Sequence, residues 1–506
     1  MAERPSLPSV CIALGFPSTE KLLEQASREA LAGETFLEFR LDHLSSPAEG
    51  AAAIRTFRAQ YPGCSILATC RRHQNHGKFN GSIAEEVRIL LDAVSSGARA
   101  VDLEIESAET AGPMVEELRS AAFLIVSYHN FDGTPSVDAL VRRMSRVPAD
   151  AYKIVTTARK PSDNFRVLSI ARGPHRVPVV VLAMGEAGFP TRVLSPAFGG
   201  LFTYAAPIAA EGTAPGQISS RRLRNEFRLG KFTRDAHIYG VIADPVRHSL
   251  SPQVHNRAFQ ARRMDAVYLP FLVKTGQLRD FFVLARQLPI AGASVTIPHK
   301  QKVMRCLDAV DSLARRIGAV NTVWRKAGKW RGANTDAQGV LKPMEKRLRL
   351  AKSSVLLVGN GGAARGAAYA MSEAGAKLSI VGRNIDRVRA LAKACDAEVL
   401  ASSQLPGRRF DALVHATPLG MSPHTNECFF EGDIPADVVL DMVYNPLETV
   451  LLRRAREQHC EVIPGIEMFI EQAAQQFEIW TGETAPRAVM EKAAVEALTQ
   501  PHPAAG

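Results

Sequence analysis

Eight short apolar segments recur at regular intervals in the first 230 residues, and this repetition limits the fold more than any other feature of the chain. Segments with the apolar spacing of a helix, such as Ile83–Val94 and Met114–Ala121, separate most of them. Short buried strands that alternate with helices form a parallel sheet. Eight such units within about 220 residues are typical of a (β/α)8 TIM barrel. The expected strands are Val10–Leu14, Phe36–Leu41, Ser65–Thr69, Ala100–Ile105, Phe123–Tyr128, Ala151–Val155, Val177–Met184 and Leu201–Tyr204.

A different pattern follows these eight units. The charged stretch 221–235 is expected to close the barrel with a last helix and then to link onward to a mixed region that begins at Ile238. A second α/β unit opens at residue 354, and we expect the segment Glu467–Leu498 to be helical. The strands expected in this second unit are Ser354–Gly359, Leu378–Val381, Ala412–His415 and Val438–Met442. The pattern therefore predicts an α/β protein throughout.

Composition excludes several classes of protein. Apolar residues make up 46% and charged residues 22%, which is typical of a soluble globular chain. No apolar run approaches the roughly 18 residues that a membrane helix needs, and Met1–Pro8 makes a poor signal peptide. The seven cysteines are scattered without a C-x-x-C pair, which argues against a disulfide scaffold or a zinc site. We expect a cytoplasmic protein with no metal and no membrane partner.

The net charge of +11 suits anionic ligands. Nucleic acid is one such ligand, but the Lys and Arg residues are spread along the chain and form no long basic run. We therefore expect small anionic molecules, and no nucleic acid, as partners. The sequence leaves open whether the chain forms a homo-oligomer.

Polar residues stand at the ends of several predicted barrel strands, where the active residues of such barrels lie. Lys153 interrupts the strand-like run Ala-Tyr-Lys-Ile-Val-Thr-Thr. Desolvation and neighbouring cations lower the pKa of a lysine and make its amine nucleophilic toward a carbonyl. An ordinary salt bridge is the alternative for Lys153. The polar residues at these positions are Glu38, Arg40, Arg71, His129, Lys153, Arg192 and Gln217.

The three arginines and the histidine of this set have clear chemical uses. Arg40, Arg71 and Arg192 can supply the cations beside the amine or clamp a substrate carboxylate, which a guanidinium group suits. His129 ends its strand and is a candidate acid or base because its free pKa lies near neutrality. His129 and Lys153 lie on consecutive predicted strands, so we expect them to be neighbours at the barrel mouth.

Over residues 10 to about 228 the chain resembles type I 3-dehydroquinate dehydratase. The motifs that carry the resemblance occur in order and are Leu37-Glu38-Phe39-Arg40, Thr69-Cys70-Arg71, Ser127-Tyr128-His129-Asn130-Phe131, Tyr152-Lys153-Ile154, Met184-Gly185 with Arg192, and Ala214-Pro215-Gly216-Gln217-Ile218. The resemblance implies that Lys153 forms an imine with the ring ketone. It implies that His129 removes the adjacent proton and helps to expel the hydroxyl as water, which yields 3-dehydroshikimate.

The same resemblance implies the roles of the other polar residues. Arg192 and Gln217 would hold the substrate carboxylate and hydroxyls, and Glu38, Arg40 and Arg71 would fix the ring. One departure from the family is visible, because members commonly carry an acid shortly after the arginine that matches Arg71. Here residues 72–77 read Arg-His-Gln-Asn-His-Gly. Asn75 can hydrogen-bond His129 but cannot raise its pKa by charge, so the pH optimum of this step stays open.

A glycine-rich turn opens the second α/β unit. The buried-type strand Val355–Val358 runs into Gly359-Asn360-Gly361-Gly362-Ala363-Ala364, and a helix is expected after it. Such a turn lets the backbone approach a pyrophosphate at the helix N-terminus, and the strand–turn–helix context favours a dinucleotide site. NAD-binding proteins usually place an acid at the end of the next strand. Here the sequence is Ile380-Val381-Gly382-Arg383-Asn384, so we expect Arg383 to pair with a 2′-phosphate and predict NADP as the cofactor.

Residues 237 to about 500 resemble shikimate dehydrogenase. The motifs are Ser249-Leu250-Ser251-Pro252, Val295-Thr296-Ile297-Pro298-His299-Lys300, Gly318-Ala319-Val320-Asn321-Thr322, Asn334-Thr335-Asp336, Ala416-Thr417-Pro418-Leu419-Gly420-Met421, Asp441-Met442-Val443-Tyr444-Asn445-Pro446, and Pro464-Gly465 through Met468 to Gln472. Three positions depart from the family: Ser294 and His415 stand where Asn is frequent, and Gly382-Arg383-Asn384 stands where Asn-Arg-Thr is usual.

This second resemblance implies a ketone reduction in which Lys300 supplies or relays the proton and Asp336 orients it. The residues implied to bind the carboxylate and hydroxyls of shikimate are Ser249, Ser251, Thr296, Asn321, Tyr444 and Gln472. Those implied to line the cofactor site are Gly359, Asn360, Gly361, Gly362, Ala363, Arg383, Asn384, Thr417, Met421 and Gly465.

The two resemblances together predict three domains. They are a barrel at residues 1–230, a substrate-binding domain at 231–337 completed by C-terminal helices at about 467–500, and a Rossmann-like NADP-binding domain at 338–466. They also imply two consecutive reactions, because the product of the first is the ketone that the second reduces. Two alternatives stay open: the C-terminal half prefers quinate with NAD, or the chain is a regulatory homologue without catalysis.

Overall fold

The computed structural model describes residues 7–208, 212–214, 216–247 and 249–499. The chain divides into two compact units, one of residues up to 236 with 269–289, and one of 237–268 with the residues from 290 onward. Pro215, part of one expected motif, lies outside the described residues. Within the described ranges, no helix has both the length and the apolar character needed to cross a bilayer.

The first unit contains one parallel sheet of eight strands in the order β7-β6-β5-β4-β3-β2-β1-β8. The Leu201 N–H donates to the Val179 carbonyl (2.8 Å), which links the two end strands of this sheet. The barrel prediction is therefore confirmed, and each expected strand appears within two residues of its predicted bounds. The strands are β1 (Val10–Leu14), β2 (Phe36–Arg40), β3 (Ser65–Thr69), β4 (Ala100–Glu104), β5 (Phe123–His129), β6 (Ala151–Thr157), β7 (Val179–Met184) and β8 (Thr203–Ala205).

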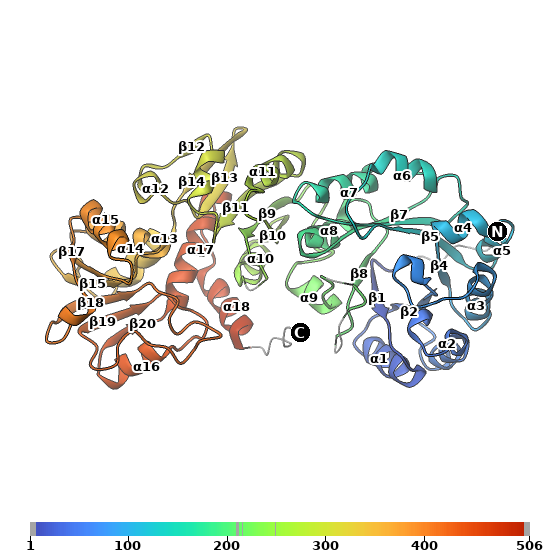
Figure 1. The fold of residues 1–506 in the computed structure, drawn as a ribbon, viewed down its shortest axis with the longest axis horizontal. Helices are drawn as coiled ribbons and strands as arrows, with labels where there is room; N and C mark the ends of the chain where they lie inside the picture. The colour runs from blue at the N-terminus through green and yellow to red at the C-terminus, as the bar shows by residue number, and fades with distance from the viewer. Residues whose placement is uncertain (1–6, 209–211, 215, 248, 500–506) are drawn as a thin grey trace. The chain divides into compact units, whose positions relative to one another are not determined.

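Helices cover the outside of this sheet (Figure 1). Each presents an apolar stripe inward, as Leu22 and Ala26 of α1 and Val87 and Leu90 of α3 illustrate. The expected closing helix is short, because α9 ends at Asn225. The helices are α1 (Thr19–Leu31), α2 (Gly50–Gln60), α3 (Ile83–Ser95), α4 (Ile105–Ala111), α5 (Met114–Ala121), α6 (Val137–Met144), α7 (Asp163–Arg172), α8 (Phe189–Leu194) and α9 (Ser220–Asn225).

A mixed sheet follows in the order β10-β9-β11-β13-β14-β12. Its central strands β9 and β11 are parallel, whereas β13 is antiparallel to both β11 and β14. The strands are β9 (His237–Ala243), β10 (Ala266–Leu272), β11 (Ile290–Val295), β12 (Ala309–Val310), β13 (Thr322–Lys326) and β14 (Lys329–Ala333). The helices of this segment are α10 (Ser251–Ala261), α11 (Leu278–Gln287) and α12 (Ser312–Ile317).

The third sheet is parallel throughout, in the order β17-β16-β15-β18-β19-β20. This is the doubly wound arrangement expected of a dinucleotide-binding domain, with the order reversing between β15 and β18. The strands are β15 (Ser354–Val358), β16 (Lys377–Val381), β17 (Glu398–Val399), β18 (Phe410–His415), β19 (Ala436–Asp441) and β20 (Glu461–Ile463). Its helices are α13 (Asp336–Glu345), α14 (Gly362–Glu373), α15 (Ile385–Cys395) and α16 (Val450–Glu457).

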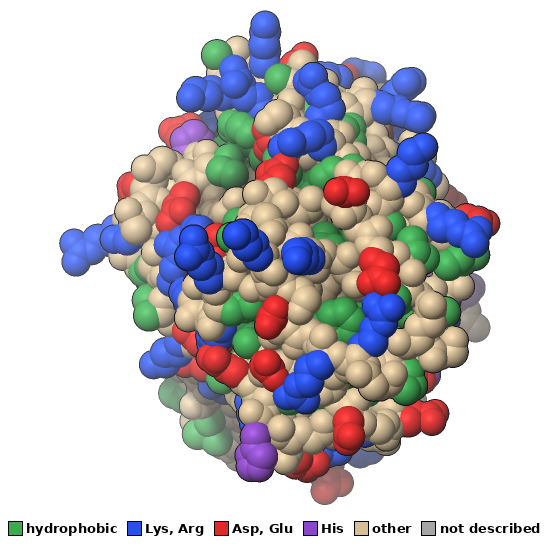
Figure 2. All heavy atoms as spheres, turned by 90° about the vertical axis from the view of Figure 1, so that its left-hand side faces the viewer, with side chains coloured by type: hydrophobic (Ala, Val, Ile, Leu, Met, Phe, Trp, Pro, Cys, Tyr) green, Lys and Arg blue, Asp and Glu red, His purple; other side chains and the backbone are tan. Residues whose placement is uncertain are grey.

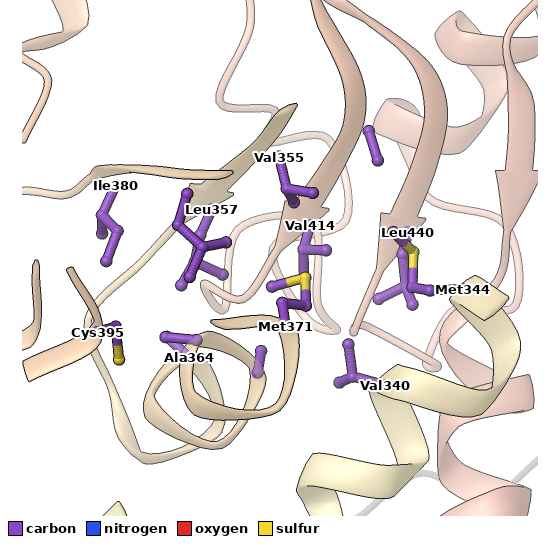
Figure 3. Close-up of a cluster of buried hydrophobic side chains, with 14 of the residues drawn as sticks. Val340, Met344, Val355, Leu357, Ala364, Met371, Ile380, Cys395, Val414 and Leu440 are labelled. Carbon is purple, nitrogen blue, oxygen red and sulfur yellow. The ribbon is translucent and has the colours of Figure 1, made fainter. Parts of the chain in front are cut away.

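Helix α13 is held by the core of this third sheet. Figure 3 shows Val340 and Met344 of α13 beside Met371 of α14, against the strand residues Val414 and Leu440. All five side chains are fully buried, and burying aliphatic side chains stabilises a fold by about 1.5–3 kcal/mol each. The packing matters for function because α13 begins at Asp336, one of the expected catalytic residues.

The C-terminal segment differs from the prediction of one helix over Glu467–Leu498. Two helices form instead, α17 (Gly465–Thr481) and α18 (Arg487–Thr499). Helix α17 ends at Gly482, whose φ of 74° lies in the left-handed region that favours glycine. The Trp480 indole N–H donates to the Val323 carbonyl (3.1 Å), which ties α17 to the mixed sheet.

Basic and acidic side chains are mixed on the face of the molecule drawn in Figure 2. On the face drawn in Figure 2, Lys and Arg side chains are interspersed with Asp and Glu side chains. Several exposed pairs, such as Arg409 with Asp437 (2.6 Å), neutralise each other locally. This face therefore carries no continuous basic stripe of the kind that binds a phosphate backbone.

Candidate active sites

A cavity of about 210 Å³ opens at the C-terminal ends of the barrel strands. It is lined by all seven polar residues expected at this end, namely Glu38, Arg40, Arg71, His129, Lys153, Arg192 and Gln217. The register of the sheet explains the convergence, because Ser127 of β5 pairs with Lys153 of β6 and every second side chain points inward. The fold thus brings together residues separated by up to 179 positions in the sequence.

The amine of Lys153 lies at the bottom of this cavity, and its side chain is 6% exposed. Its Nζ donates to Asp102 Oδ2 and to the Tyr204 hydroxyl, both at 2.9 Å, and lies 3.7 Å from Glu38 Oε1. The sequence predicted arginines beside this amine, but its direct contacts are two carboxylates and a phenol. The surroundings therefore hold Nζ in place through anions rather than activating it through adjacent cations.

Arg71 connects Lys153 to His129. One of its terminal nitrogens donates to Asp102 Oδ1 (3.1 Å) and the other to His129 Nδ1 (3.0 Å). Glu104 Oε1 lies 3.6 Å from the same guanidinium, and Ser127 donates to Asp102 Oδ1 (2.6 Å). Because a guanidinium group has no lone pair to offer, it donates to Nδ1, and the proton of neutral His129 is placed on Nε2.

Burial and neighbouring charges shift the pKa values of Asp102 and His129. Burial by itself would raise the pKa of Asp102, but Lys153 and Arg71 hold that pKa well below its usual range. Desolvation and the Arg71 and Lys153 cations lower the pKa of His129 well below its usual range. His129 is therefore neutral at neutral pH and able to accept a proton.

The remaining expected residues form the wall of the cavity. Arg40 donates two hydrogen bonds to Asp42 (2.9 and 2.8 Å), so its charge is partly neutralised within the protein. Arg192 is 2% exposed, and burial lowers its pKa to about 10. A buried cation of this kind favours a bound carboxylate, because a partner of opposite charge offsets the desolvation. Gln217 lies beside Thr213, with 3.5 Å between their side-chain oxygens.

Asn75 lines the cavity but does not hold His129. Its amide donates to Glu106 Oε2 (3.3 Å), whereas His129 Nδ1 is bound by Arg71. The hydrogen bond that the sequence suggested between Asn75 and His129 is therefore not formed. His129 is held instead by Arg71, which also donates to Asp102.

Three functional residues escaped the sequence reasoning: Asp102, Glu104 and Tyr204. The run Ala-Val-Asp-Leu-Glu of β4 places two acids two residues apart, on the same face of a buried strand. Acids are rarely buried without a partner, so this alternation was a readable signal. Tyr204 offered no comparable signal, because its contact with Lys153 joins positions 51 residues apart.

A second cavity, of about 450 Å³, lies between the mixed sheet and the third sheet. All of the expected shikimate-binding and catalytic residues of this half line it: Ser249, Ser251, Thr296, Lys300, Asn321, Asp336, Tyr444 and Gln472. Three of the expected cofactor residues, Ala363, Met421 and Gly465, line it as well. The cavity therefore reaches the end of the glycine turn, at the first turn of α14, from the substrate side.

A compact network joins Lys300 and Asp336, the expected catalytic pair of this cavity. Lys300 Nζ donates to Asp336 Oδ2 (2.6 Å), and the Asn321 amide donates to Asp336 Oδ1 (2.8 Å). The same amide lies 3.2 Å from Gln472 Oε1 of α17. Backbone bonds fix these positions, since the Val320 N–H donates to the Lys300 carbonyl (2.8 Å). One carboxylate thus bridges a flexible ammonium group and a rigid amide.

A layer of polar residues lies behind this network. The Tyr268 hydroxyl donates to Ser294 Oγ (2.6 Å), which donates to Gln476 Oε1 (2.7 Å). Gln476 donates in turn to the Asn321 carbonyl (3.2 Å). Ser294, which replaces the frequent Asn of the family, therefore still connects the substrate cavity with α17. Gln476 was not expected from the sequence, although it lies one helical turn after Gln472.

The glycine turn has the shape that a pyrophosphate requires. A Cβ at Gly359, whose φ is 128°, would lie 2.8 Å from the Ala416 carbonyl oxygen. A Cβ at Gly361 or Gly362 would meet no atom within 4 Å. Open space at the first turn of α14, with backbone N–H groups facing it, fits the phosphates of a dinucleotide.

Arg383 and Asn384 stand at the end of β16, beside this turn. Arg383 is exposed, and Asn384 caps α15 by accepting from the Arg387 N–H (3.0 Å). The Asn360 amide donates to the Asn384 carbonyl (3.1 Å), which joins the glycine turn to this loop. Arg387, also exposed and one turn into α15, was not expected from the sequence and adds a second cation near Arg383.

Thr417 is fixed by a buried histidine. Asp441 lies 2.8 Å from His415 Nδ1, and the Thr417 hydroxyl lies 2.5 Å from His415 Nε2. Because a carboxylate can only accept, Nδ1 carries the proton and Nε2 accepts from Thr417. The Leu419 N–H donates to Thr417 Oγ1 (3.3 Å), so His415 orients the loop where the family has Asn. Across the described ranges, no cluster of three or more His, Cys, Asp or Glu side chains is placed to hold a metal ion.

Family models match both halves of the chain. The description "Type I 3-dehydroquinase" matches residues 10–231, which contain the barrel cavity. "Shikimate dehydrogenase substrate binding domain" matches residues 241–323, and "Shikimate / quinate 5-dehydrogenase" matches residues 342–418. "Shikimate 5'-dehydrogenase C-terminal domain" matches residues 465–495.

Two curated proteins are similar over most of the chain. A bifunctional 3-dehydroquinate dehydratase/shikimate dehydrogenase of Arabidopsis thaliana is 34% identical, over 96% of this chain and 84% of its own. The shikimate biosynthesis protein AroDE of Chlamydia pneumoniae is 31% identical, over 88% of this chain and 89% of its own. A shikimate dehydrogenase (NADP(+)) of Methanothermobacter thermautotrophicus is 38% identical, over 53% of this chain and 99% of its own. Because these relatives match over most of its length, the chain belongs to the family of bifunctional 3-dehydroquinate dehydratase/shikimate dehydrogenase proteins.

Proposed function

We propose that this chain dehydrates 3-dehydroquinate to 3-dehydroshikimate in its barrel and reduces that ketone to shikimate, with NADPH, in its second unit. The observation that carries the proposal is the pair of cavities, each with one lysine hydrogen-bonded to an aspartate. Lys153 contacts Asp102 at 2.9 Å, and Lys300 contacts Asp336 at 2.6 Å. Each cavity also presents several groups able to bind a polyhydroxylated carboxylic acid.

The first reaction starts at Lys153. Its amine attacks the ring ketone after lending a proton to a flanking carboxylate; that proton then passes to the hydroxyl of the adduct, which leaves as water, and an iminium ion remains. The iminium withdraws electrons and acidifies the adjacent carbon. Asp102 and Glu38, which flank Nζ, balance the positive charge of this intermediate.

His129 performs the elimination. In its neutral form it takes the proton from the acidified carbon and then returns a proton to the departing hydroxyl, which leaves as water. Hydrolysis of the iminium releases 3-dehydroshikimate and restores the Lys153 amine. Arg192, buried in the cavity wall, would hold the substrate carboxylate during these steps.

The second reaction needs a proton at the ketone oxygen. Lys300 would supply it, with Asp336 and Asn321 keeping the ammonium group directed at the oxygen. Ser249, Ser251 and Gln472 would bind the carboxylate and hydroxyls of the ring. Tyr444, packed on the Phe469 ring at 4.8 Å, would close one side of the cavity.

NADPH, when bound, supplies the hydride for this reduction. Its pyrophosphate would lie at Gly361 and Gly362, where the structure leaves room for it. Arg383 and Arg387 would pair with the 2′-phosphate, because they are exposed cations at the end of the second strand of the domain. The residues present therefore fit NADP. The seven scattered cysteines, which form no C-x-x-C pair, support a reducing location, which we propose to be the cytoplasm.

One assay tests the whole proposal. The protein is mixed with 3-dehydroquinate and NADPH, and the product is identified by mass spectrometry; shikimate is the expected product, and quinate formation would overturn the substrate assignment. Borohydride reduction in the presence of 3-dehydroquinate tests the chemistry of the barrel. A covalent adduct on Lys153 is expected, and its absence from the native protein would reject the imine mechanism.

A further inference from the structure

Two buried carboxyl groups lie behind the barrel site and are not used by the mechanism above. Glu86 on α3 is 0% exposed, and Glu104 at the end of β4 is 1% exposed. Each has one oxygen with an evident partner: Glu86 Oε2 accepts from Ser107 (2.7 Å), and Glu104 Oε1 accepts from the Arg72 N–H (2.9 Å). Within the described part of the chain, Glu86 Oε1 and Glu104 Oε2 have no donor to accept from.

A single proton resolves this arrangement. Glu104 acts on the ionisation of Glu86, and each carboxyl group has a buried oxygen that lacks a donor, so one proton held between them would satisfy both oxygens. Burial, the bond to Glu104 and the charge of Glu104 raise the pKa of Glu86 well above its usual range. Glu86 therefore carries the proton at neutral pH, and it faces Glu104, which lies against Arg71 and accepts from the Arg72 N–H.

Glu104 stands one contact away from the catalytic histidine. Its Oε1 lies 3.6 Å from Arg71, and Arg71 donates to His129 Nδ1 at 3.0 Å. The charged and titratable groups that face Glu86 are Glu104 on β4 and, after β3, Arg72 and the Cys70 thiol. A second negative charge at Glu86 would compete with Glu104 for the arginines and pull the guanidinium groups away from the cavity.

We propose that Glu86 is a positioning residue for the dehydration: it holds a proton against Glu104, and so leaves Glu104 as a singly charged anchor that keeps Arg71 beside His129. The inference rests on the proposed function, because it assumes that His129 acts in the reaction. It also accounts for a barrel site without the acid that the family usually places near position 75. Arg71, which donates to His129, is held in place by Glu104 of this carboxyl pair.

The test compares E86Q, E86L and the matched control E85Q, in which an exposed carboxyl on the same helix is changed. The amide of E86Q can donate to Glu104 and accept from Ser107 without a titrating proton. The dehydratase kcat of the native protein is expected to fall at alkaline pH as Glu86 ionises, and in E86Q this fall should move upward or disappear. E85Q should follow the native profile, and a profile of E86Q that superimposes on the native one would overturn the proposal.

E86L supplies a second measurement, because it leaves Glu104 Oε2 without a donor. Its dehydratase kcat at neutral pH should fall about tenfold, the size expected when a buried polar group loses its partner, while KM changes much less. The dehydrogenase activity of the same polypeptide reports whether each variant is folded. An unchanged kcat in E86L would also overturn the proposal.

Borohydride trapping separates this inference from the proposed function. If every variant forms an adduct on Lys153 but E86Q keeps the native pH profile, the role of Glu86 alone is wrong. If the native protein forms no adduct, the imine mechanism fails, and the positioning role fails with it.

Discussion

Asp102 lies between two cations of the barrel site and binds each with a different oxygen. Oδ2 accepts from Lys153 Nζ at 2.9 Å, and Oδ1 accepts from Arg71 at 3.1 Å. This single carboxylate therefore sets the separation between the nucleophilic amine and the arginine that holds His129. Its position on β4, the strand adjacent to His129 on β5, fixes all of these groups to one rigid sheet.

We expect D102N to lower the dehydratase kcat at least about tenfold, because two buried cations would lose their common counter-charge. An absorbance assay for 3-dehydroshikimate measures the loss. D92N, which changes an exposed carboxylate on α3, is the matched control and should retain native activity. Native kcat in D102N would show that Asp102 does not position Lys153 and Arg71.

The lowered pKa of His129 predicts the acid limb of the dehydratase. Because the pKa lies well below its usual value of 6.5, the neutral base persists to lower pH than in a free histidine. The profile of kcat/KM against pH should therefore lose activity only below pH 6.5. An acid limb centred at or above that pH would contradict the assignment of His129 as the base in the free enzyme.

In the second unit, N321A should affect catalysis more than cofactor binding. The substitution removes the amide that holds Asp336 Oδ1, so the Lys300–Asp336 pair loses its fixed direction. We expect the dehydrogenase kcat to fall about 10- to 100-fold, in the range that a misplaced acid or base group costs. Initial-rate kinetics should show a nearly constant KM for NADPH, and the dehydratase activity serves as the folding control. A change confined to KM for NADPH would contradict this role.

Cofactor choice is tested by R383Q. If Arg383 pairs with the 2′-phosphate, its loss should raise KM for NADPH by about tenfold or more and leave KM for NADH nearly unchanged. R389Q is the control, because Arg389 is exposed on α15 and lies 3.8 Å from Asp386. Equal effects of R383Q on both cofactors would reject the pairing.

His255 predicts a pH dependence of folding. Burial against Tyr268 and Trp480 lowers its pKa to about 3, so the unfolded chain binds a proton there below pH 6.5 while the folded chain does not. The stability from this group is present above pH 6.5 and is lost as the pH falls toward 3, at about 1.4 kcal/mol per unit. Urea unfolding of H255F, which keeps an aromatic ring, measures this effect. The free energy of unfolding of the variant should change with pH by about 1.4 kcal/mol less per unit than that of the native protein in this range. An identical slope would contradict the burial of a neutral imidazole.

Local sequence was sufficient to predict the strands and the glycine turn. The apolar runs of β1 to β7 were found within two residues of their bounds, because a strand buried on both faces must be apolar along its whole length. The turn at Gly359 was readable because close backbone approach admits only glycine there. Lys153 was visible as a candidate because a charged side chain inside an apolar strand is unusual, and Lys300 because it lies in the loop after an apolar strand.

Relations between distant segments were decided by the tertiary structure alone. The contacts of Lys153 with Asp102 and Tyr204 each span 51 residues, and periodicity within a strand carries no information about which side chain faces it across a barrel. Arg71 was expected at the substrate, but its place against Asp102 and His129 depends on the register of β3, β4 and β5. The break at Gly482 was likewise missed, since helical spacing continues on both sides of it. The sequence determined which groups are present, and the packing of the strands determined which of them contact each other.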